Sequence, residues 1–194
     1  MPLVVLYDAN VLYPSTLRDV LIRVGLARLV QPKWTEQILD EMFLALRMNR
    51  PDLDTERLDR TRELMNASIR DVAVRGYGHR IEAVNLPDPD DRHVLAAAIH
   101  AGAHVIVTKN LRDFPANDVA PWGVSVRHPD TFLTELHTRH PDTLRAIMSA
   151  IAHAWGSVDA TPDQVIDRLA VDAPGAAGRI RASLHRGSGP ESAT

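Results

Sequence analysis

The stretch Leu3-Val4-Val5-Leu6-Tyr7-Asp8-Ala9-Asn10 places an acid directly after a run of five apolar residues. A second apolar run, Val105-Ile106-Val107, closes on Thr108-Lys109-Asn110, and Asp113 lies just beyond it. Short apolar runs of this kind are typical of strands buried in a parallel sheet. Because open α/β sheets bind ligands at the carboxyl ends of their strands, we expect Asp8 and Asp113 to be neighbours in space.

Between these two runs, apolar residues recur with the 3.6-residue period of amphipathic helices. The expected elements are a helix capped by Ser15 or Thr16, a helix capped by Thr35, a polar helix over 55–71, a short strand over 81–86 and a helix from Asp91 to Gly102. This alternation of strands and helices favours a parallel sheet.

Beyond Phe114, prolines separate segments whose pattern is helical rather than sheet-like. The expected elements are a short strand over 124–126, helices starting near Asp130 and Asp142, a helix with a Thr161/Gln164 capping box, a hinge over 174–178 and a last helix over 179–185. We therefore divide the chain into a main domain over 1–128, a helical C-terminal extension packed on it over 129–186, and a disordered tail over 187–194.

Composition limits the function classes. The chain has 194 residues, 45% hydrophobic content and no cysteine, which excludes disulfides, thiol nucleophiles and cysteine zinc sites. A formal charge of -3 argues against broad electrostatic capture of nucleic acid, but it does not exclude an RNA substrate. The longest apolar stretch, 94–107, is interrupted by His100 and His104. We therefore expect no membrane span, and the absence of cysteine, which fits a reducing compartment, leads us to expect a cytoplasmic protein.

Four acids stand on the expected elements: Asp8, Glu41, Asp91 and Asp113. Close carboxylates repel by about 4 kcal/mol per pair at an effective dielectric near 20, and a divalent cation removes that cost. Each acid also has a purely structural interpretation. Asp8 and Asp113 could cap turns, Glu41 could be a solvated helix residue, and any acid of Asp88-Pro89-Asp90-Asp91 could cap the following helix.

Taken together, four segments resemble the PIN domain family, and more narrowly the VapC-type toxins of bacterial toxin–antitoxin pairs, over roughly the first two-thirds of the chain. They are Leu6-Tyr7-Asp8-Ala9-Asn10, Glu41 inside the second helix, Asp91 with Val94-Leu95-Ala96-Ala97-Ala98, and Thr108-Lys109-Asn110-Leu111-Arg112-Asp113-Phe114. The resemblance selects Asp91 among the neighbouring acids. It implies a three-layer α/β/α fold with a central parallel sheet, and an endoribonuclease that depends on Mg²⁺ or Mn²⁺.

The resemblance also implies roles for single residues and partners. Asp8, Glu41, Asp91 and Asp113 would form the catalytic set, supported by Asn10, Thr108 and Asn110. Expected partners are an RNA substrate, a cognate antitoxin protein and a second copy of the chain.

From the chemistry of Mg²⁺ we expect Asp8 and Asp91 to bind the ion directly. Glu41 and Asp113 would then orient waters, complete a second metal position or act as the base. Arg47, Arg50, Lys109 and Arg112 are candidates for contacts to RNA phosphates, although arginines of this kind also simply keep a surface soluble.

Several alternatives stay open. A housekeeping RNA-processing nuclease would carry the same acids, and a PIN-like fold could serve as a non-catalytic interaction module. A phosphatase of the haloacid dehalogenase type would need a second acid two residues after Asp8, where this chain has Asn10. The nine histidines, among them His93 and His137, show no metal-binding spacing and are interpreted as surface or capping residues.

Overall fold

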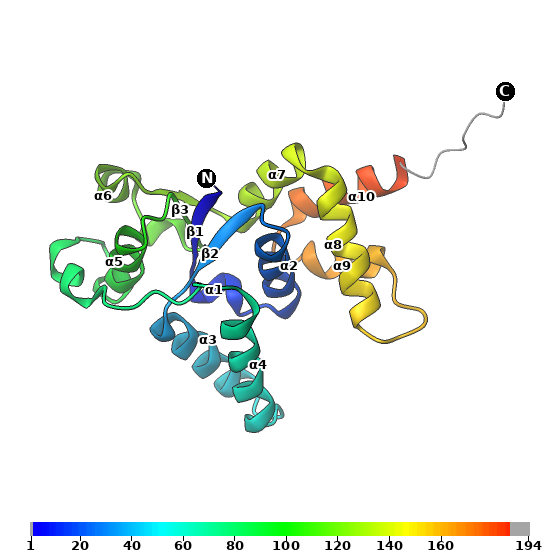
Figure 1. The fold of residues 1–194 in the computed structure, drawn as a ribbon, viewed down its shortest axis with the longest axis horizontal. Coiled ribbons are helices and arrows are strands. Elements are labelled where there is room, and N and C mark those ends of the chain that lie inside the picture. Colours follow the sequence, from blue (N-terminus) through cyan, green and yellow to red (C-terminus); the bar gives the residue numbers. More distant parts are fainter. Residues whose placement is uncertain (1, 187–194) are drawn as a thin grey trace. The chain divides into compact units, whose positions relative to one another are not determined.

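The computed structural model describes residues 2–186. The chain divides into two compact units, Met1–His128 and Pro129–Thr194, and each is described by itself (Figure 1).

The first unit is built on a four-stranded sheet in the order β2-β1-β3-β4, in which all neighbouring strands are parallel. The strands are β1 (Leu3–Tyr7), β2 (Val30–Lys33), β3 (Val105–Val107) and β4 (Ser125–Arg127). Tyr7 pairs with Val107 at the ends of β1 and β3. The next residues of the two strands, Asp8 and Thr108, therefore leave the sheet side by side.

The elements that surround the sheet form two helical layers. They are α1 (Ala9–Leu12), α2 (Ser15–Leu26), α3 (Glu36–Asn49), α4 (Thr55–Ser68), α5 (Arg92–His100) and α6 (Ala116–Val119), with 3-10 turns η1 (Gly78–Ala83), η2 (Pro89–Asp91), η3 (Leu111–Asp113) and η4 (Ala120–Trp122). In the strand order β2-β1-β3-β4, the connection from β1 to β2 runs toward one edge of the sheet, and the connection from β2 to β3 runs back toward the other edge. Because parallel crossovers are right-handed, α2 and α5 cover opposite faces of the sheet, as Figure 1 shows. The predicted three-layer α/β/α fold is confirmed.

Strand β2 was not anticipated from the sequence, because it is short and contains Pro32. A proline is tolerated there because β2 is the edge strand of the sheet and one side of it needs no ladder donor. Helix α2 approaches this strand closely. A Cβ atom on Gly25 would lie 2.4 Å from Pro32 Cγ, so glycine is required at this crossing.

Two local predictions in this unit are wrong. Residues 81–86 do not form a strand, since η1 occupies Gly78–Ala83 and packs against α5. Only Val84 and Leu86 of that segment are buried, which is too little for a buried strand. Helix α2 begins at Ser15 after Pro14 and has no side-chain cap, whereas Thr35 caps α3 as expected by accepting from the backbone N–H of Ile38 at 3.0 Å.

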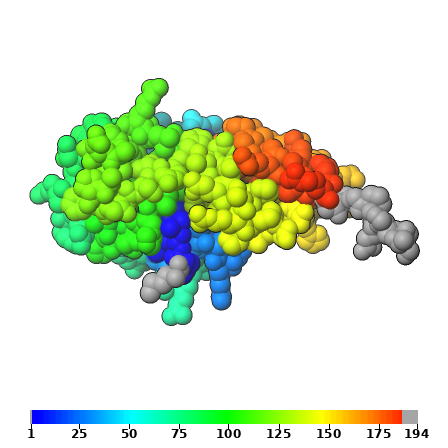
Figure 2. Space-filling model, turned by 90° about the horizontal axis from the view of Figure 1, so that it is seen from above, coloured from blue at the N-terminus to red at the C-terminus, as the bar shows by residue number. Residues whose placement is uncertain are grey.

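The second unit consists of α7 (Pro129–Arg139), α8 (Pro141–Ala154), α9 (Pro162–Leu169) and α10 (Pro174–Arg186). Helix α10 contacts the other three, and Figure 2 shows it in orange to red along the yellow surface of α8. The Thr161/Gln164 capping box is present at the start of α9. The predicted starts of α7 and α8 are confirmed.

The hinge expected over 174–178 is wrong, because these residues form the first turns of α10. Gly175 lets the Asp130 carboxylate come close, and Asp130 Oδ1 accepts from the backbone N–H of Ala176 at 2.7 Å. Glycine at position 175 therefore makes room for the Asp130 carboxylate and does not mark a flexible hinge. The predicted tail, 187–194, lies outside the described residues. Within residues 2–186, no helix combines the length and apolar character that crossing a membrane requires.

Candidate metal centre

Asp8 is buried at the carboxyl end of β1, with 5% of its surface exposed. Its backbone N–H donates to the carbonyl of Val107 at 3.1 Å, which ties the end of β1 to β3. Its carboxylate accepts from the backbone N–H of Ala9, from Asn10 Nδ2 and from Thr108 Oγ1, each at 2.7 Å. Burial raises the pKa of Asp8, while the hydrogen bonds from Thr108 and Ala9 oppose that shift.

The polar residues predicted to support Asp8 form one connected network. Asn10 donates to Thr108 Oγ1 at 2.8 Å and accepts from the backbone N–H of Lys109 at 2.9 Å. Thr108 Oγ1 also accepts from the backbone N–H of Asn110 at 3.0 Å, and Asn110 Nδ2 donates to the Asp113 carboxylate. The loops after β1 and β3 are therefore joined by side-chain hydrogen bonds, and the network leads from Asp8 to Asp113.

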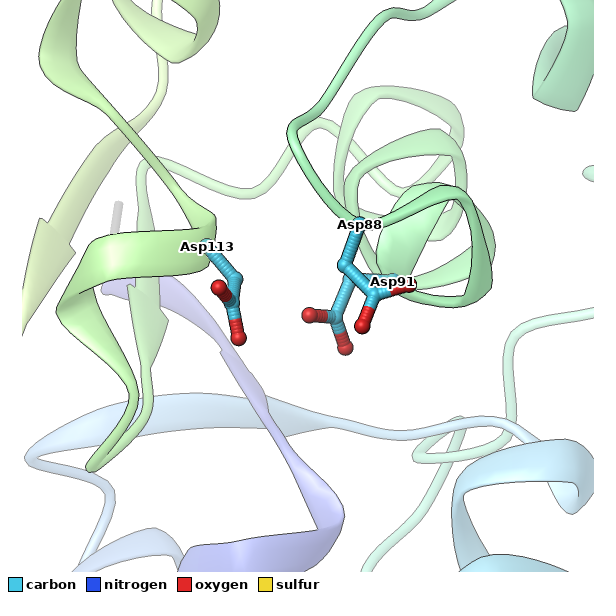
Figure 3. A group of neighbouring side chains, drawn as sticks. All are labelled: Asp88, Asp91 and Asp113. Carbon is cyan, nitrogen blue, oxygen red and sulfur yellow. The ribbon is translucent and has the colours of Figure 1, made fainter.

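A cluster of three aspartates lies where α5 begins. Oxygen atoms of Asp88, Asp91 and Asp113 all lie within 4.8 Å of one another. Figure 3 shows Asp88 and Asp91 on one turn of the chain and Asp113 facing them from η3. Asp88 precedes the turn η2 and caps it by accepting from the backbone N–H of Asp90 at 2.9 Å. Asp91 is the N-cap residue of α5 but makes no side-chain capping bond, so its carboxylate can face the cluster.

Asp88 was not among the predicted site residues. Its distance of three residues from Asp91 could have indicated it, because residues three apart point the same way on a 3-10 turn. The sequence alone did not show that the Asp-Pro-Asp-Asp run adopts this turn.

Burial and neighbouring negative charges both act on the Asp91 carboxylate. Its pKa is raised to about 7 by burial and then by the charges of Asp8, Asp113 and Asp88, while His93 opposes the shift. Asp8 and Asp113 thus both lie close enough for their charges to raise the pKa of Asp91. The carboxylates therefore form one electrostatic group in which a bound cation would be stabilised.

Glu41 reaches this group from α3. Its Oε1 lies 2.9 Å from Nε2 of His93, and its charge raises the pKa of Asp8. The interpretation of His93 and His137 as surface or capping residues is wrong. His93 is buried in the first turn of α5, and His137 is buried in the second unit, where its Nε2 lies 3.0 Å from Ser183 Oγ. The spacing of the histidines in the sequence did not indicate that Glu41 and Ser183 would be their partners.

The basic residues proposed for RNA contact differ in their surroundings. Arg47 pairs with Asp59 at 3.0 Å, and Arg50 pairs with Asp52 at 2.7 Å, so both guanidinium groups have acidic partners. Lys109 and Arg112 lie in the loop after β3, next to Asn110 and Asp113. Arg112 is exposed.

Comparisons with known proteins bear on both units. Residues 4–112 match the PIN domain family, and residues 129–182 match a family described as the VapC50 C-terminal domain. The chain is 34% identical over 113 residues to a protein of Mycobacterium tuberculosis named "Putative ribonuclease VapC50". That alignment covers 58% of this chain and 66% of the relative, slightly less than two thirds of its length.

No solved structure matches the chain. The PIN domain match spans more than half of the residues and covers β1, β2 and β3, the helices between them and the segments that carry Asp8, Asp88 and Asp91. The chain belongs to the PIN domain family.

Proposed function

We propose that this chain is a divalent-metal-dependent endoribonuclease that hydrolyses phosphodiester bonds in RNA. The observation that carries the proposal is the cluster of Asp88, Asp91 and Asp113, whose oxygen atoms lie within 4.8 Å of one another, with Asp8 near enough for its charge to contribute to the raised pKa of Asp91, about 7. The name of the mycobacterial relative, which contains the word ribonuclease, supports RNA as the substrate.

The donor set suits Mg²⁺ or Mn²⁺. Carboxylate oxygens are the ligands that Mg²⁺ prefers, and the oxygen atoms of the three aspartates, all within 4.8 Å of one another, are close enough to bind one ion together. Asp88, Asp91 and Asp113 would hold the ion. Asp8 Oδ1 accepts a single hydrogen bond, from Ala9, and so keeps a lone pair with which it would complete the set. A bound divalent ion neutralises negative charge on the phosphate and lowers the pKa of a coordinated water.

The remaining residues would orient this chemistry. Asn10 and Thr108 hold the Asp8 carboxylate in place through their hydrogen bonds. Glu41, with 44% of its side chain exposed, would orient the attacking water and accept its proton. Lys109 and Arg112 would contact RNA phosphates next to the cluster. Arg47 and Arg50, which pair with Asp59 and Asp52, would contribute further phosphate contacts.

The decisive experiment measures cleavage of a fluorescently labelled single-stranded RNA with Mg²⁺, Mn²⁺ or EDTA. We expect cleavage only with a divalent ion, and a loss of at least about a hundredfold in Asp8→Asn and Asp91→Asn. Asp90→Asn is the matched control, because Asp90 is exposed beside Asp91 and lies outside the cluster. Cleavage in EDTA, or an active Asp8→Asn protein, would contradict the proposal.

We propose further that this nuclease is the toxin of a type II toxin–antitoxin pair, that it forms a homodimer, and that a cognate antitoxin binds it. The match of residues 129–182 to the VapC50 C-terminal domain supports this assignment. Induced expression in a bacterial host should arrest growth, whereas the Asp91→Asn variant should not. Co-expression of a small protein encoded beside this gene should restore growth. RNA cleavage without growth arrest would instead indicate a housekeeping nuclease.

A further inference from the structure

His93 has an unusual position for a histidine of an amphipathic helix. It is the second residue of α5, two residues after Asp91, and 4% of its side chain is exposed. Its Nε2 lies 2.9 Å from Glu41 Oε1. Its Nδ1 is buried and has no hydrogen-bond partner among residues 2–186. Among residues 2–186, the contact with Glu41 is therefore the one polar side-chain interaction of this buried ring.

Glu41 in turn depends on His93. It lies in the middle of α3, with 44% of its side chain exposed, and within the described part of the chain His93 is its one ion-pair or hydrogen-bond partner. An exposed glutamate has several rotamers, and ordering it costs side-chain entropy. A partner fixed by burial can hold the carboxylate in one of these rotamers.

The imidazole also stands among the other acids. Its charge opposes the upward shifts in the pKa of Asp8 and of Asp91, so it lies near both carboxylates. Helices α3 and α5 carry Glu41 and His93 to the same place from positions 52 residues apart in the sequence. The contact thus joins α3 to the turn that carries Asp88 and Asp91.

We propose that His93 is a positioning residue that holds the Glu41 carboxylate in the metal centre by donating from Nε2. The inference rests on the proposed function, in which Glu41 orients the attacking water. In a neutral ring with Nδ1 unpartnered, the single proton on Nε2 reaches Glu41, and a charged ring carries a proton on Nε2 as well, so Nε2 donates to Glu41 in either form. The role is exerted through Glu41, without contact between His93 and the substrate.

The test is a double-mutant cycle between His93 and Glu41. His93→Leu removes the donor and keeps an apolar side chain of similar bulk, whereas His93→Gln keeps an N–H donor. We expect His93→Leu to lower kcat for RNA cleavage by about tenfold with little change in KM, and His93→Gln to recover most of the loss. In the Glu41→Gln background, His93→Leu should cause no further loss. Losses that multiply in the double variant would overturn the proposal.

A second measurement separates this inference from the proposed function. Binding of Mn²⁺, followed by calorimetric titration of the whole protein, should weaken by about tenfold in His93→Leu, and this effect too should vanish in the Glu41→Gln background. If the wild-type chain cuts no RNA with any metal, the proposed function fails while the Mn²⁺ cycle still tests the contact. Mn²⁺ affinity unchanged by His93→Leu would overturn the inference.

The matched control is His100→Leu. His100 is the last residue of α5, is exposed, and packs edge-on against His79, away from the carboxylates. We expect wild-type cleavage and Mn²⁺ binding from it. Circular dichroism must show the wild-type helical signal for each variant. If His93→Leu fails to fold, His93→Ala, which also removes the donor, replaces it in both cycles, with His93→Gln again expected to recover most of the loss.

Discussion

Asp91 sets the pH dependence that we expect of the metal centre. Its pKa of about 7 in the folded protein lies above its ordinary value of 3.8, so folding favours the protonated form. That contribution to stability is present below about pH 4 and is lost as the pH rises through about 7. Without metal, the melting temperature should therefore fall as the pH is raised from about 5 to 8, and the fall should be smaller in Asp91→Asn.

Metal binding should show the opposite trend, since the ion competes with protons for the same carboxylates. We expect Mn²⁺ affinity to increase as the pH rises through about 7, measured by titration at several pH values. The exposed neighbour Asp90 offers a control, because Asp90→Asn should keep the wild-type pH profile. Mn²⁺ affinity that does not vary with pH would mean that Asp91 is not a ligand.

Asp88 and Asp90 should behave differently although they are two residues apart. Asp88→Asn removes one charge of the cluster but keeps an oxygen that can accept from the backbone N–H of Asp90, so the turn should survive. Loss of a charged ligand should weaken Mn²⁺ binding by at least about tenfold. Asp90→Asn should have no such effect. Equal affinities of the two variants would remove Asp88 from the centre.

At the scale of elements, the junction between β1 and β3 relies on Thr108. Its side chain is fully buried, donates to Asp8 and accepts from Asn10 and from the backbone N–H of Asn110. Thr108→Val keeps the shape but leaves these groups without their partner. We expect the free energy of unfolding in urea to fall by about 1–3 kcal/mol.

The control for this prediction is Thr61→Val. The Thr61 hydroxyl donates only to the carbonyl of Arg57 one turn earlier in α4, so its removal should change stability by less than about 0.5 kcal/mol. If both valine variants unfold at the same urea concentration, the network around Asp8 does not stabilise the junction.

At the scale of the whole molecule, every residue of the proposed centre lies in the unit Met1–His128. We predict that a fragment of residues 1–128 folds and binds Mn²⁺ within about threefold of the full chain, since a domain with its own core can fold alone. Calorimetric titration and thermal unfolding of the fragment would test this. A fragment that folds but does not bind Mn²⁺ would show that the C-terminal helices are needed for the centre.

Much of the fold could be predicted because its signals are local. The apolar runs before Asp8 and Thr108 indicated β1 and β3, and the Thr35 cap indicated the start of α3. Local signals failed where tertiary contacts decide the outcome. The β2 strand depends on pairing with β1, and Gly175 belongs to a helix because the carboxylate of Asp130, on another helix, caps that end.

By itself, the sequence determined the parallel α/β framework and the acids that follow its strands, because strand and helix periods and strand-end positions are properties of short segments. Only the tertiary structure decided that Asp88 faces Asp113 and that His93 contacts Glu41. Those distances depend on how separate loops and helices pack, and packing is settled by the whole unit rather than by the residues near either partner.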